Sequence, residues 1–355
     1  MITIMTLKKN KVLLGLSGGV DSTAAVLVLR EKGFDVTGYY FDVLGDNQEG
    51  REHAQRVADQ LEIPLIIEDV SKTFRDIVIA NFCESYASGR TPNPCVMCNP
   101  NVKFKMLINK ANEIGAYYIA TGHYAQIIEE NGIFYIAQGK NQRKDQSYML
   151  YRLGQDVLSR LIFPLGQQVD KEDVRNIARN KGMINAETKD SQEICFISDD
   201  ENHLDYIREH GYNDKQGNFV DKEGRVLGPH QGIGKYTIGQ RKGLGIALGK
   251  PAFVIAIDSI TGNVVLGDNE DLFTTNVYAT DVVFASKDIL TQLPLSVEAK
   301  IRYASKPTAA TISMEEDGTI KAVFETPQRA ATPGQSMVFY EKGKVIGGGF
   351  IVQHN

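Results

Sequence analysis

The chain has 355 residues, of which 42% are hydrophobic, and a formal net charge of -5. This length predicts two or three domains, each with its own hydrophobic core. The balance of 44 acidic and 39 basic residues excludes a general attraction for polyanions, so a nucleic acid would have to bind at local basic patches. No apolar run approaches the ~20 residues of a membrane span, and the N-terminal segment has no signal-peptide cleavage site. We therefore expect a cytoplasmic protein with no membrane partner.

Strand and helix patterns alternate through the first part of the chain. We expect strands at 11–16, 35–43, 64–70 and 116–122, and helices at 23–30, 49–61, 73–87 and 102–114. This alternation predicts an α/β fold with a doubly wound, largely parallel sheet. A hairpin turning at Asn131-Gly132 is expected at the sheet edge, followed by helices at 147–153 and 171–181. The polar stretch 186–198 is a candidate functional loop.

The second half of the chain has a different character. Glycine-rich turns from about residue 203 predict a small α+β linker domain. Beyond Pro251, short alternating runs separated by turn residues predict a C-terminal all-β barrel. The expected domains are therefore 1–202 for the N-terminal α/β domain, 203–270 for the central domain and 271–355 for the barrel.

The segment Ser17-Gly18-Gly19-Val20-Asp21-Ser22 lies between the first expected strand and the first expected helix. Its glycines let backbone N–H groups approach an anion at a helix start, and Ser17 and Ser22 offer hydroxyl donors. Asp21 would repel a phosphate unless a cation lay between them, which makes it a candidate Mg²⁺ ligand. No lysine follows the glycines, so this is not a kinase-type P-loop. The simpler structural alternative is that Ser17 or Asp21 only caps the helix.

This loop resembles the pyrophosphatase loop of the PP-loop ATPases. The resemblance implies that ATP is cleaved between its α- and β-phosphates and that AMP is transferred to a carbonyl oxygen of the substrate. The superfamily includes amide-forming synthetases and RNA-modifying enzymes. The loop alone therefore predicts adenylation but does not identify the substrate.

Three cysteines lie in polar segments: Cys95 and Cys98 form a C-x-x-C in the proline-stiffened loop 91–99, and Cys195 follows later. A structural zinc would need a fourth ligand, and no cysteine or histidine lies at ligand spacing from Cys195. Besides zinc and a purely structural role, two chemical interpretations remain open. In the first, Cys195 carries a persulfide and Cys98 is its nucleophilic or resolving partner. In the second, the three thiolates hold a 4Fe-4S cluster with one iron open to sulfide. Cys83, in an apolar helix, is expected in the core.

Further motifs follow in a fixed order along the chain. They are SGGVDS, GRTPNPCVMCN (89–99) with Lys103-Phe104, TGHYA (121–125), KDQSY (144–148), FPLG (163–166), DSQEICFI (190–197), YTIGQRKGL (236–244), Arg302-Tyr303 and TPGQ (332–335). Together they resemble the bacterial tRNA-specific 2-thiouridylases over nearly the whole chain. These enzymes replace O2 of the wobble uridine by sulfur in tRNAs for Lys, Glu and Gln. The resemblance implies three partners: ATP, the anticodon arm of tRNA, and a sulfur donor that is a cysteine desulfurase, a relay protein or sulfide.

The resemblance also implies individual site residues. ATP is expected at Gly15, Leu16, Ser17, Gly18, Gly19, Val20, Asp21 and Ser22, with Phe41 at a strand end and Gly122 near the adenine. The target base is expected at Asn93, Pro94 and Cys95, and other tRNA contacts at His123, Lys144, Asp145, Gln146, Arg302, Tyr303 and Gln335. Cys98 is the expected nucleophile and Cys195 the sulfur carrier. Simpler alternatives are that Asp145 caps a helix and that Lys300, Arg302 and Lys306 form a solvated strand face.

Two positions depart from the family pattern. Cys95 stands where the family usually has an aspartate, a candidate general acid or base, and a thiol is a poor proton shuttle at neutral pH. The change supplies a third thiolate beside Cys98 and Cys195, which favours the cluster interpretation. Glu193 stands where a glycine is usual, and the sequence offers no firm account of that change.

The predicted chemistry has two steps because a pyrimidine carbonyl oxygen is a poor leaving group. Transfer of AMP to O2 of a flipped uridine makes it a good one, and sulfur then attacks C2 and expels AMP. The central and C-terminal domains are expected to grip the anticodon stem-loop. Two alternatives stay open: an amide-forming synthetase, in which the three cysteines are irrelevant, and a non-catalytic iron-sulfur or zinc RNA-binding protein, in which ATP is irrelevant. Substitutions at Asp21 and Cys195 discriminate between them.

Overall fold

The computed structural model describes residues 8–188, 194–197, 202–212 and 214–353. Its chain divides into two units. The first comprises Met1–Ile77, Cys95–Gln192 and Lys342–Ile346, and the second Val78–Pro94, Glu193–Glu341 and Gly347–Asn355. Cys95 and Cys98 therefore belong to the first unit, whereas Cys195 belongs to the second.

The first unit is built on a five-stranded sheet with the order β3-β2-β1-β4-β7. Its strands are β1 (Lys8–Gly15), β2 (Asp35–Asp42), β3 (Leu65–Asp69), β4 (Ala116–Ala120) and β7 (Leu161–Ile162). The strand pairings in it are parallel. Since β1 lies in the middle and the chain crosses over to add strands on both sides, the carboxyl end of β1 is a topological switch point, where open α/β sheets bind ligands.

Helices cover both faces of this sheet. The longer ones are α1 (Val20–Glu31), α2 (Gln48–Gln60), α6 (Phe104–Ile114) and α8 (Lys171–Arg179). Leu14 packs in one buried cluster with residues of α1, α2 and α8, such as Val26, Val57 and Val174. Leu13 alternates to the opposite face, where α6 packs on β1 and β4. The predicted doubly wound α/β domain is confirmed.

The shorter helices differ from the sequence prediction. They are α3 (Ser71–Phe74), α4 (Ala80–Ala87), α5 (Pro94–Cys98), α7 (Gln155–Leu158), α9 (His203–Glu209), the π-helices Arg75–Ile79 and Asn99–Lys103, and the 3₁₀ helix Ser147–Met149. The helix predicted at 73–87 is confirmed as helical throughout, but its segment Arg75–Ile79 is a π-helix, which the sequence does not predict. The loop predicted at 91–99 is wrong for residues 94–98, which form α5. Pro94 occupies the first helical position, which needs no N–H partner.

The predicted hairpin is confirmed as β5 (Ala125–Glu130) and β6 (Ile133–Gln138). Asn131 and Gly132 both have positive φ, as the favoured two-residue hairpin turn requires. Its predicted place is wrong, however, because β7 occupies the edge beside β4. The hairpin instead pairs with β17, where Lys344 lies opposite Ala137 and its ammonium is 2.6 Å from the Glu130 carboxylate.

The second unit contains a small four-stranded sheet with the order β10-β11-β8-β9. Its strands are β8 (Gly217–Val220), β9 (Val226–His230), β10 (Phe253–Asp258) and β11 (Asn263–Gly267). Phe219, Tyr236, Val254 and Val264 form its core with the 3₁₀ helix Ile233–Lys235. With α9, these elements match the predicted small α+β domain, although β10 and β11 were expected from the strand pattern in the barrel.

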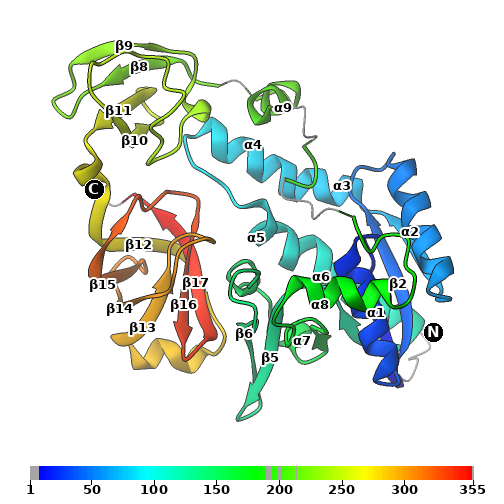
Figure 1. Cartoon of the computed structure of the whole chain (residues 1–355). Coiled ribbons are helices and arrows are strands. Elements are labelled where there is room, and N and C mark those ends of the chain that lie inside the picture. The colour runs from blue at the N-terminus through cyan, green and yellow to red at the C-terminus, as the bar shows by residue number, and fades with distance from the viewer. Residues whose placement is uncertain (1–7, 189–193, 198–201, 213, 354–355) are drawn as a thin grey trace, which may run out of the picture. The chain divides into compact units, whose positions relative to one another are not determined.

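The barrel is the other part of the second unit (Figure 1, yellow to red). Its strands are β12 (Phe273–Phe284), β13 (Leu295–Lys300), β14 (Thr308–Met314), β15 (Ile320–Arg329), β16 (Ser336–Glu341) and β17 (Lys344–Val352), with the 3₁₀ helices Asn269–Leu272 and Lys287–Gln292. Antiparallel pairing in the order β12-β15-β14-β13-β16-β17 is closed by a β12–β17 pairing. The predicted all-β barrel is confirmed. Within the described residues, no helix has the length and apolarity that a bilayer span requires.

Candidate active site

The glycine-rich loop joins the end of β1 to α1, as the sequence predicts. Ser17 is exposed, and its Oγ accepts a hydrogen bond from the Gly19 N–H at 3.4 Å and lies 3.3 Å from the Ser22 Oγ. The Ser22 hydroxyl donates to the Gly19 carbonyl at 2.9 Å. In this described segment no side chain caps α1. The first N–H groups of α1 are therefore available to an anion, and the helix-cap alternative for Ser17 and Asp21 is wrong.

The predicted nucleotide residues surround this loop. A Cβ on Gly15 would lie 3.2 Å from the Phe41 ring, and a Cβ on Gly122 would lie 2.9 Å from the Asp21 carbonyl carbon and 3.0 Å from the Ser22 nitrogen. The segment after β4 thus touches the first turn of α1, and only a glycine fits there. Leu16 and Val20 are buried in the core, so they would offer a ligand their backbone alone.

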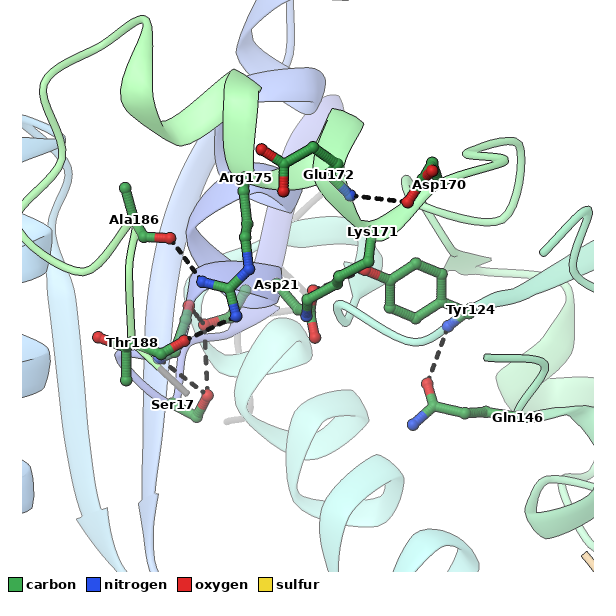
Figure 2. Close-up of polar contacts among 12 residues, drawn as sticks. Ser17, Asp21, Tyr124, Gln146, Asp170, Lys171, Glu172, Arg175, Ala186 and Thr188 are labelled. Carbon is green, nitrogen blue, oxygen red and sulfur yellow. Dashed lines mark hydrogen bonds and ion pairs between the residues drawn. The ribbon is translucent and has the colours of Figure 1, made fainter. Parts of the chain in front are cut away.

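Asp21 lies between two donors (Figure 2). Its Oδ1 accepts hydrogen bonds from the Tyr124 hydroxyl at 2.7 Å and from the Lys171 ammonium at 2.6 Å. The Asp21 side chain is 34% exposed and that of Lys171 is 15% exposed. Among the described residues, its hydrogen bonds all involve Oδ1. The other carboxylate oxygen, Oδ2, is a hard donor of the kind that Mg²⁺ prefers.

Four residues that hold the loop or its neighbours carry no motif in the sequence. His53 Nε2 lies 3.1 Å from the Gly18 carbonyl. Asn185 Nδ2 donates to the same carbonyl at 2.5 Å and to Thr23 Oγ1 at 2.7 Å. Arg175 donates to the carbonyls of Ala186 at 2.8 Å and Thr188 at 3.0 Å (Figure 2). Together with Lys171 they come from α2, α8 and the segment after it, and no local pattern marks them.

The four cysteines differ in environment. Cys95 is exposed on α5 and Cys98, at the end of α5, is partly buried. Burial raises the pKa of the Cys98 thiol, the Lys103 ammonium lowers it, and Cys95 raises it again. Cys195 is exposed, in the second unit. Over the ranges that the structure describes, no group of three or more His, Cys, Asp and Glu side chains is arranged to hold a metal ion.

Two other sequence expectations concern Cys83 and the polar loop. Cys83 is fully buried, and burial raises its pKa to about 11, which confirms it as a core residue. Within the loop predicted at 186–198, residues 189–193 and 198 lie outside the described part of the chain. Glu193 is among them, so its departure from the family pattern stays without a structural account.

His123 and the segment Lys144-Asp145-Gln146 belong to the first unit. They lie near the glycine-rich loop 17–22, because Tyr124, next to His123, donates its hydroxyl hydrogen to Asp21 and its backbone N–H to Gln146. His123 packs between Phe104 and Phe163, with ring centroids 6.0 and 5.9 Å away, and its Nδ1 is 2.7 Å from Thr121 Oγ1. Burial, and then the Lys103 ammonium, hold the pKa of His123 well below its usual range, so its imidazole is neutral at neutral pH. Lys144 is half-buried.

Asp145 and Gln146 are engaged with the chain itself. Asp145 is 5% exposed, and its carboxylate accepts from the Gly139 N–H at 3.0 Å, the Ser147 N–H at 3.2 Å and the Ser147 hydroxyl at 2.8 Å. These bonds hold Asp145 in the turn ahead of the short 3₁₀ helix that replaces the helix predicted at 147–153, but the N-cap of that helix is Gln146 and no side chain caps it, so the capping alternative is wrong. Gln146 Oε1 accepts from the Tyr124 N–H at 2.9 Å (Figure 2).

Gln335 lies in the turn before β16, in the second unit. Its Nε2 donates to the carbonyls of Thr91 at 3.0 Å and Pro92 at 3.3 Å, and the Thr91 N–H donates to Pro333 at 2.9 Å. The TPGQ turn of the barrel therefore holds the backbone that directly precedes Asn93 and Pro94. The sequence offers both motifs but not this contact between them.

Arg302 follows β13 in the same unit. Its guanidinium donates to the Ala330 carbonyl at 2.7 Å, to Thr332 Oγ1 at 2.9 Å and to the Ile238 carbonyl at 3.3 Å. Tyr303 is exposed, with the Lys300 ammonium 5.8 Å from its ring centroid. Lys300 is only 6% exposed, so the solvated-face alternative is wrong for that residue.

Three family models match the chain. A tRNA methyl transferase HUP domain model matches residues 10–199, a PRC-barrel domain model 205–268, and an aminomethyltransferase β-barrel domain model 274–351. The tRNA-specific 2-thiouridylase MnmA 2 of Clostridium botulinum is 48% identical over 351 residues, which cover 97% of this chain and 99% of that protein. The tRNA-specific 2-thiouridylase MnmA of Clostridium perfringens is 47% identical over 356 residues, covering 97% and 98%. The chain belongs to the family of the MnmA tRNA-specific 2-thiouridylases.

Proposed function

We propose that the protein is an ATP-dependent tRNA 2-thiouridylase that adenylates O2 of the wobble uridine and replaces it by sulfur, releasing AMP and pyrophosphate. The observation that carries this proposal is the loop at the switch point of the sheet. Its uncapped α1 N-terminus and hydroxyl donors suit a polyphosphate, and the partly exposed Asp21 carboxylate suits the accompanying Mg²⁺. The relatives from Clostridium botulinum and Clostridium perfringens, which are 48% and 47% identical to this chain over almost their full length, are named tRNA-specific 2-thiouridylases.

In the first step, O2 of the uridine attacks the α-phosphorus of ATP. The bond from that phosphorus to the bridging oxygen breaks, and its electron pair leaves with pyrophosphate, while the uracil N3–H proton is lost to solvent or a base. We assign phosphate binding to the N–H groups and hydroxyls of the segment 17–22 and adenosine binding to the space beside Gly15, Phe41 and Gly122. Mg²⁺ at Asp21 would neutralise phosphate charge when bound.

In the second step, sulfur attacks C2 and the C2–O bond breaks with AMP as leaving group. In the persulfide route, the outer sulfur of a Cys195 persulfide is transferred and the Cys98 thiolate attacks the remaining S–S bond, giving 2-thiouridine and a Cys98–Cys195 disulfide. A thiol reductant must then restore both thiols. The raised pKa of Cys98 means that this route also needs a base for its thiol.

We favour the cluster route because Cys95 adds a third thiol to Cys98 and Cys195. The donor set fits a 4Fe-4S cluster in kind, since cysteine thiolates are the ligands of such clusters and Cys95 and Cys195 are exposed. Such a cluster would supply sulfide to C2 when bound. The protein residues would then act by holding the cluster and the flipped base.

We further propose where tRNA binds. The target base is assigned to Asn93, Pro94 and Cys95, and the contacts of the anticodon arm of tRNAs for Lys, Glu and Gln to His123, Lys144, Asp145, Gln146, Arg302, Tyr303 and Gln335. The hydrogen bonds of Asp145, Arg302 and Gln335 within the chain give these three a positioning role as well. We keep domain boundaries after residues 202 and 270 as part of this proposal, and a cytoplasmic location where tRNA and a sulfur donor are available.

The test is formation of 2-thiouridine in tRNA by anaerobically purified protein, with iron and acid-labile sulfide measured in the same sample. Asp21→Ala and Cys195→Ser are each expected to abolish sulfur incorporation, while Asp76→Ala, an exposed carboxylate on a π-helix, leaves it unchanged. Full activity of Cys195→Ser would overturn both sulfur routes, and full activity of iron-free protein would overturn the cluster. AMP formation with ammonia and a carboxylic acid, but not with tRNA, would favour an amide-forming synthetase instead.

A further inference from the structure

We propose that Lys171 has two successive partners in this site: the Asp21 carboxylate while no nucleotide is bound, and the pyrophosphate portion of ATP once it is bound. The inference rests on the proposed ATP-dependent adenylation and deepens it. It assigns to Lys171 the role of stabilising the leaving pyrophosphate. No motif contains this residue, which lies 150 positions after Asp21 in the chain.

The resting contact is close and largely screened from water. The Lys171 Nζ lies 2.6 Å from Asp21 Oδ1 and 5.7 Å from the centroid of the Tyr124 ring, and the lysine side chain is 15% exposed. The Tyr124 hydroxyl donates to the same oxygen at 2.7 Å (Figure 2). Two donors thus converge on one carboxylate oxygen in the first turn of α1, where the helix dipole already favours negative charge.

The backbone of Lys171 is held in place by α8, whereas its long side chain can bring the ammonium to more than one partner. Lys171 begins α8, whose cap Asp170 accepts from the Glu172 N–H at 3.0 Å (Figure 2). Val174, one turn further, is fully buried in the cluster shared with α1. A lysine carries a point charge on a flexible four-carbon stem, so its ammonium can move by a few ångströms while the helix stays in place.

Charge explains the exchange of partners. A Mg²⁺ ion at Asp21 replaces the ammonium as the counter-charge of that carboxylate. Lys171 then lies beside the polyphosphate that the α1 N-terminus holds. When the bond between the α-phosphorus and the bridging oxygen breaks, negative charge grows on the pyrophosphate, and a nearby ammonium stabilises this state more than the ground state. This role of Lys171 needs no proton transfer.

Arg175 is the neighbouring cation on α8, but its guanidinium has a different task. It donates to the Ala186 carbonyl at 2.8 Å and the Thr188 carbonyl at 3.0 Å (Figure 2). These bonds fix the segment after α8 on the helix. The Lys171 ammonium, in contrast, contacts the Asp21 carboxylate in the glycine-rich loop.

The experiment measures equilibrium binding of inorganic pyrophosphate, MgATP and AMP to the full chain carrying Lys171→Ala, Lys171→Arg or the control Lys181→Ala. Lys181 is exposed just beyond the end of α8. Lys171→Ala is expected to weaken pyrophosphate and MgATP binding by about 10- to 100-fold, with AMP binding unchanged, because AMP lacks the groups that Lys171 would contact. Lys171→Arg keeps the charge and should restore part of the affinity. Unchanged pyrophosphate affinity, or an equal loss for AMP, would overturn the proposal.

A second variant tests the exchange itself. In Asp21→Asn the ammonium has lost its resting partner, so metal-free pyrophosphate should bind more tightly than to the unaltered chain, and Lys171→Ala in the same background should remove that gain. Equal or weaker binding to Asp21→Asn would contradict the exchange. Because these measurements need no tRNA, a chain that binds ATP and pyrophosphate as described but forms no 2-thiouridine would refute the proposed function and leave the role of Lys171 standing.

Discussion

The side-chain amide of Asn185 donates to the carbonyl oxygen of Gly18 at 2.5 Å, which ties the segment after α8 to the glycine-rich loop. Asn185 is fully buried, and its Nδ2 also donates to Thr23 Oγ1 at 2.7 Å. Its Oδ1 has no hydrogen-bond partner among the described residues. Gly18 has φ of +81°, and His53 lies 3.1 Å from the same carbonyl. The loop conformation is thus held from outside its own sequence.

Asn185→Ala should therefore lower both stability and nucleotide affinity. It removes the side-chain donor to a buried carbonyl, which typically costs about 1–3 kcal/mol in the free energy of unfolding. We expect weaker ATP binding because the carbonyl is part of the loop. Chemical denaturation and nucleotide titration measure the two effects. Asn176→Ala, an exposed asparagine on α8, should change stability by less than ~0.5 kcal/mol, and an equally small effect at Asn185 would contradict this account.

Gly122→Ala should impair ATP binding and lower the free energy of unfolding by about 1–3 kcal/mol. The added Cβ would lie 2.9 Å from the carbonyl carbon of Asp21, which forces the first turn of α1 away from the end of β4. We expect ATP affinity to fall by about tenfold or more, equivalent to about 1.4 kcal/mol. Gly182→Asn is the control, because no atom lies within 4 Å of its Cβ position and asparagine tolerates its positive φ. Unchanged ATP affinity in Gly122→Ala would remove Gly122 from the nucleotide site.

Gln335→Glu should slow sulfur transfer without changing ATP binding. A carboxylate cannot donate to the carbonyls of Thr91 and Pro92, so the backbone before Asn93 loses its support from the barrel turn. Hydrogen exchange at residues 89–94 in the absence of tRNA measures this support directly. Faster exchange is expected than in the control Gln328→Glu, a partly buried barrel residue whose amide donates only locally, to the Thr326 carbonyl at 2.9 Å. Unchanged exchange with slower thiolation would instead assign Gln335 to tRNA contact alone.

The buried His123 predicts a pH dependence of stability. Burial and Lys103 depress its folded-state pKa well below the value of 6.5 for a free imidazole, so below that pH the unfolded chain binds a proton that the folded chain does not. The free energy of unfolding then falls with decreasing pH, by at most ~1.4 kcal/mol per pH unit for one group. Well above pH 6.5 His123 no longer makes stability depend on pH, because the imidazole is neutral in both the folded and the unfolded chain.

Denaturation of the unaltered chain and of His123→Gln at about pH 7.5 and 5.5 isolates this contribution. The variant should lose less stability over that interval than the unaltered chain. Lys103→Ala, which removes the neighbouring charge, should reduce the difference only in part, since burial is the larger cause. Equal losses in all three chains would show that His123 takes up its proton without resistance from the fold.

The sequence predicted helices and strands correctly where the residue types and the hydrophobic period favour the same element. The run before Ser17, the Asn131-Gly132 turn and the alternating strands of the barrel were all confirmed. The differences from the prediction are local. The predicted helix 73–87 contains a π-helix at Arg75–Ile79, and Pro94 starts a helix where its neighbours favoured a loop.

The sequence by itself determined the chemistry that is available: a glycine loop with Asp21, three thiols in polar segments, and motifs whose order identifies the family. Those are properties of residue type and spacing, which a chain carries before it folds. Only the tertiary structure decided which side chains meet the loop. Lys171 and Asn185 reach it because α8 packs on α1, and Gln335 reaches Thr91 because barrel closure orients the turn before β16. Contacts between distant positions depend on packing of whole elements, and no local sequence signal encodes them.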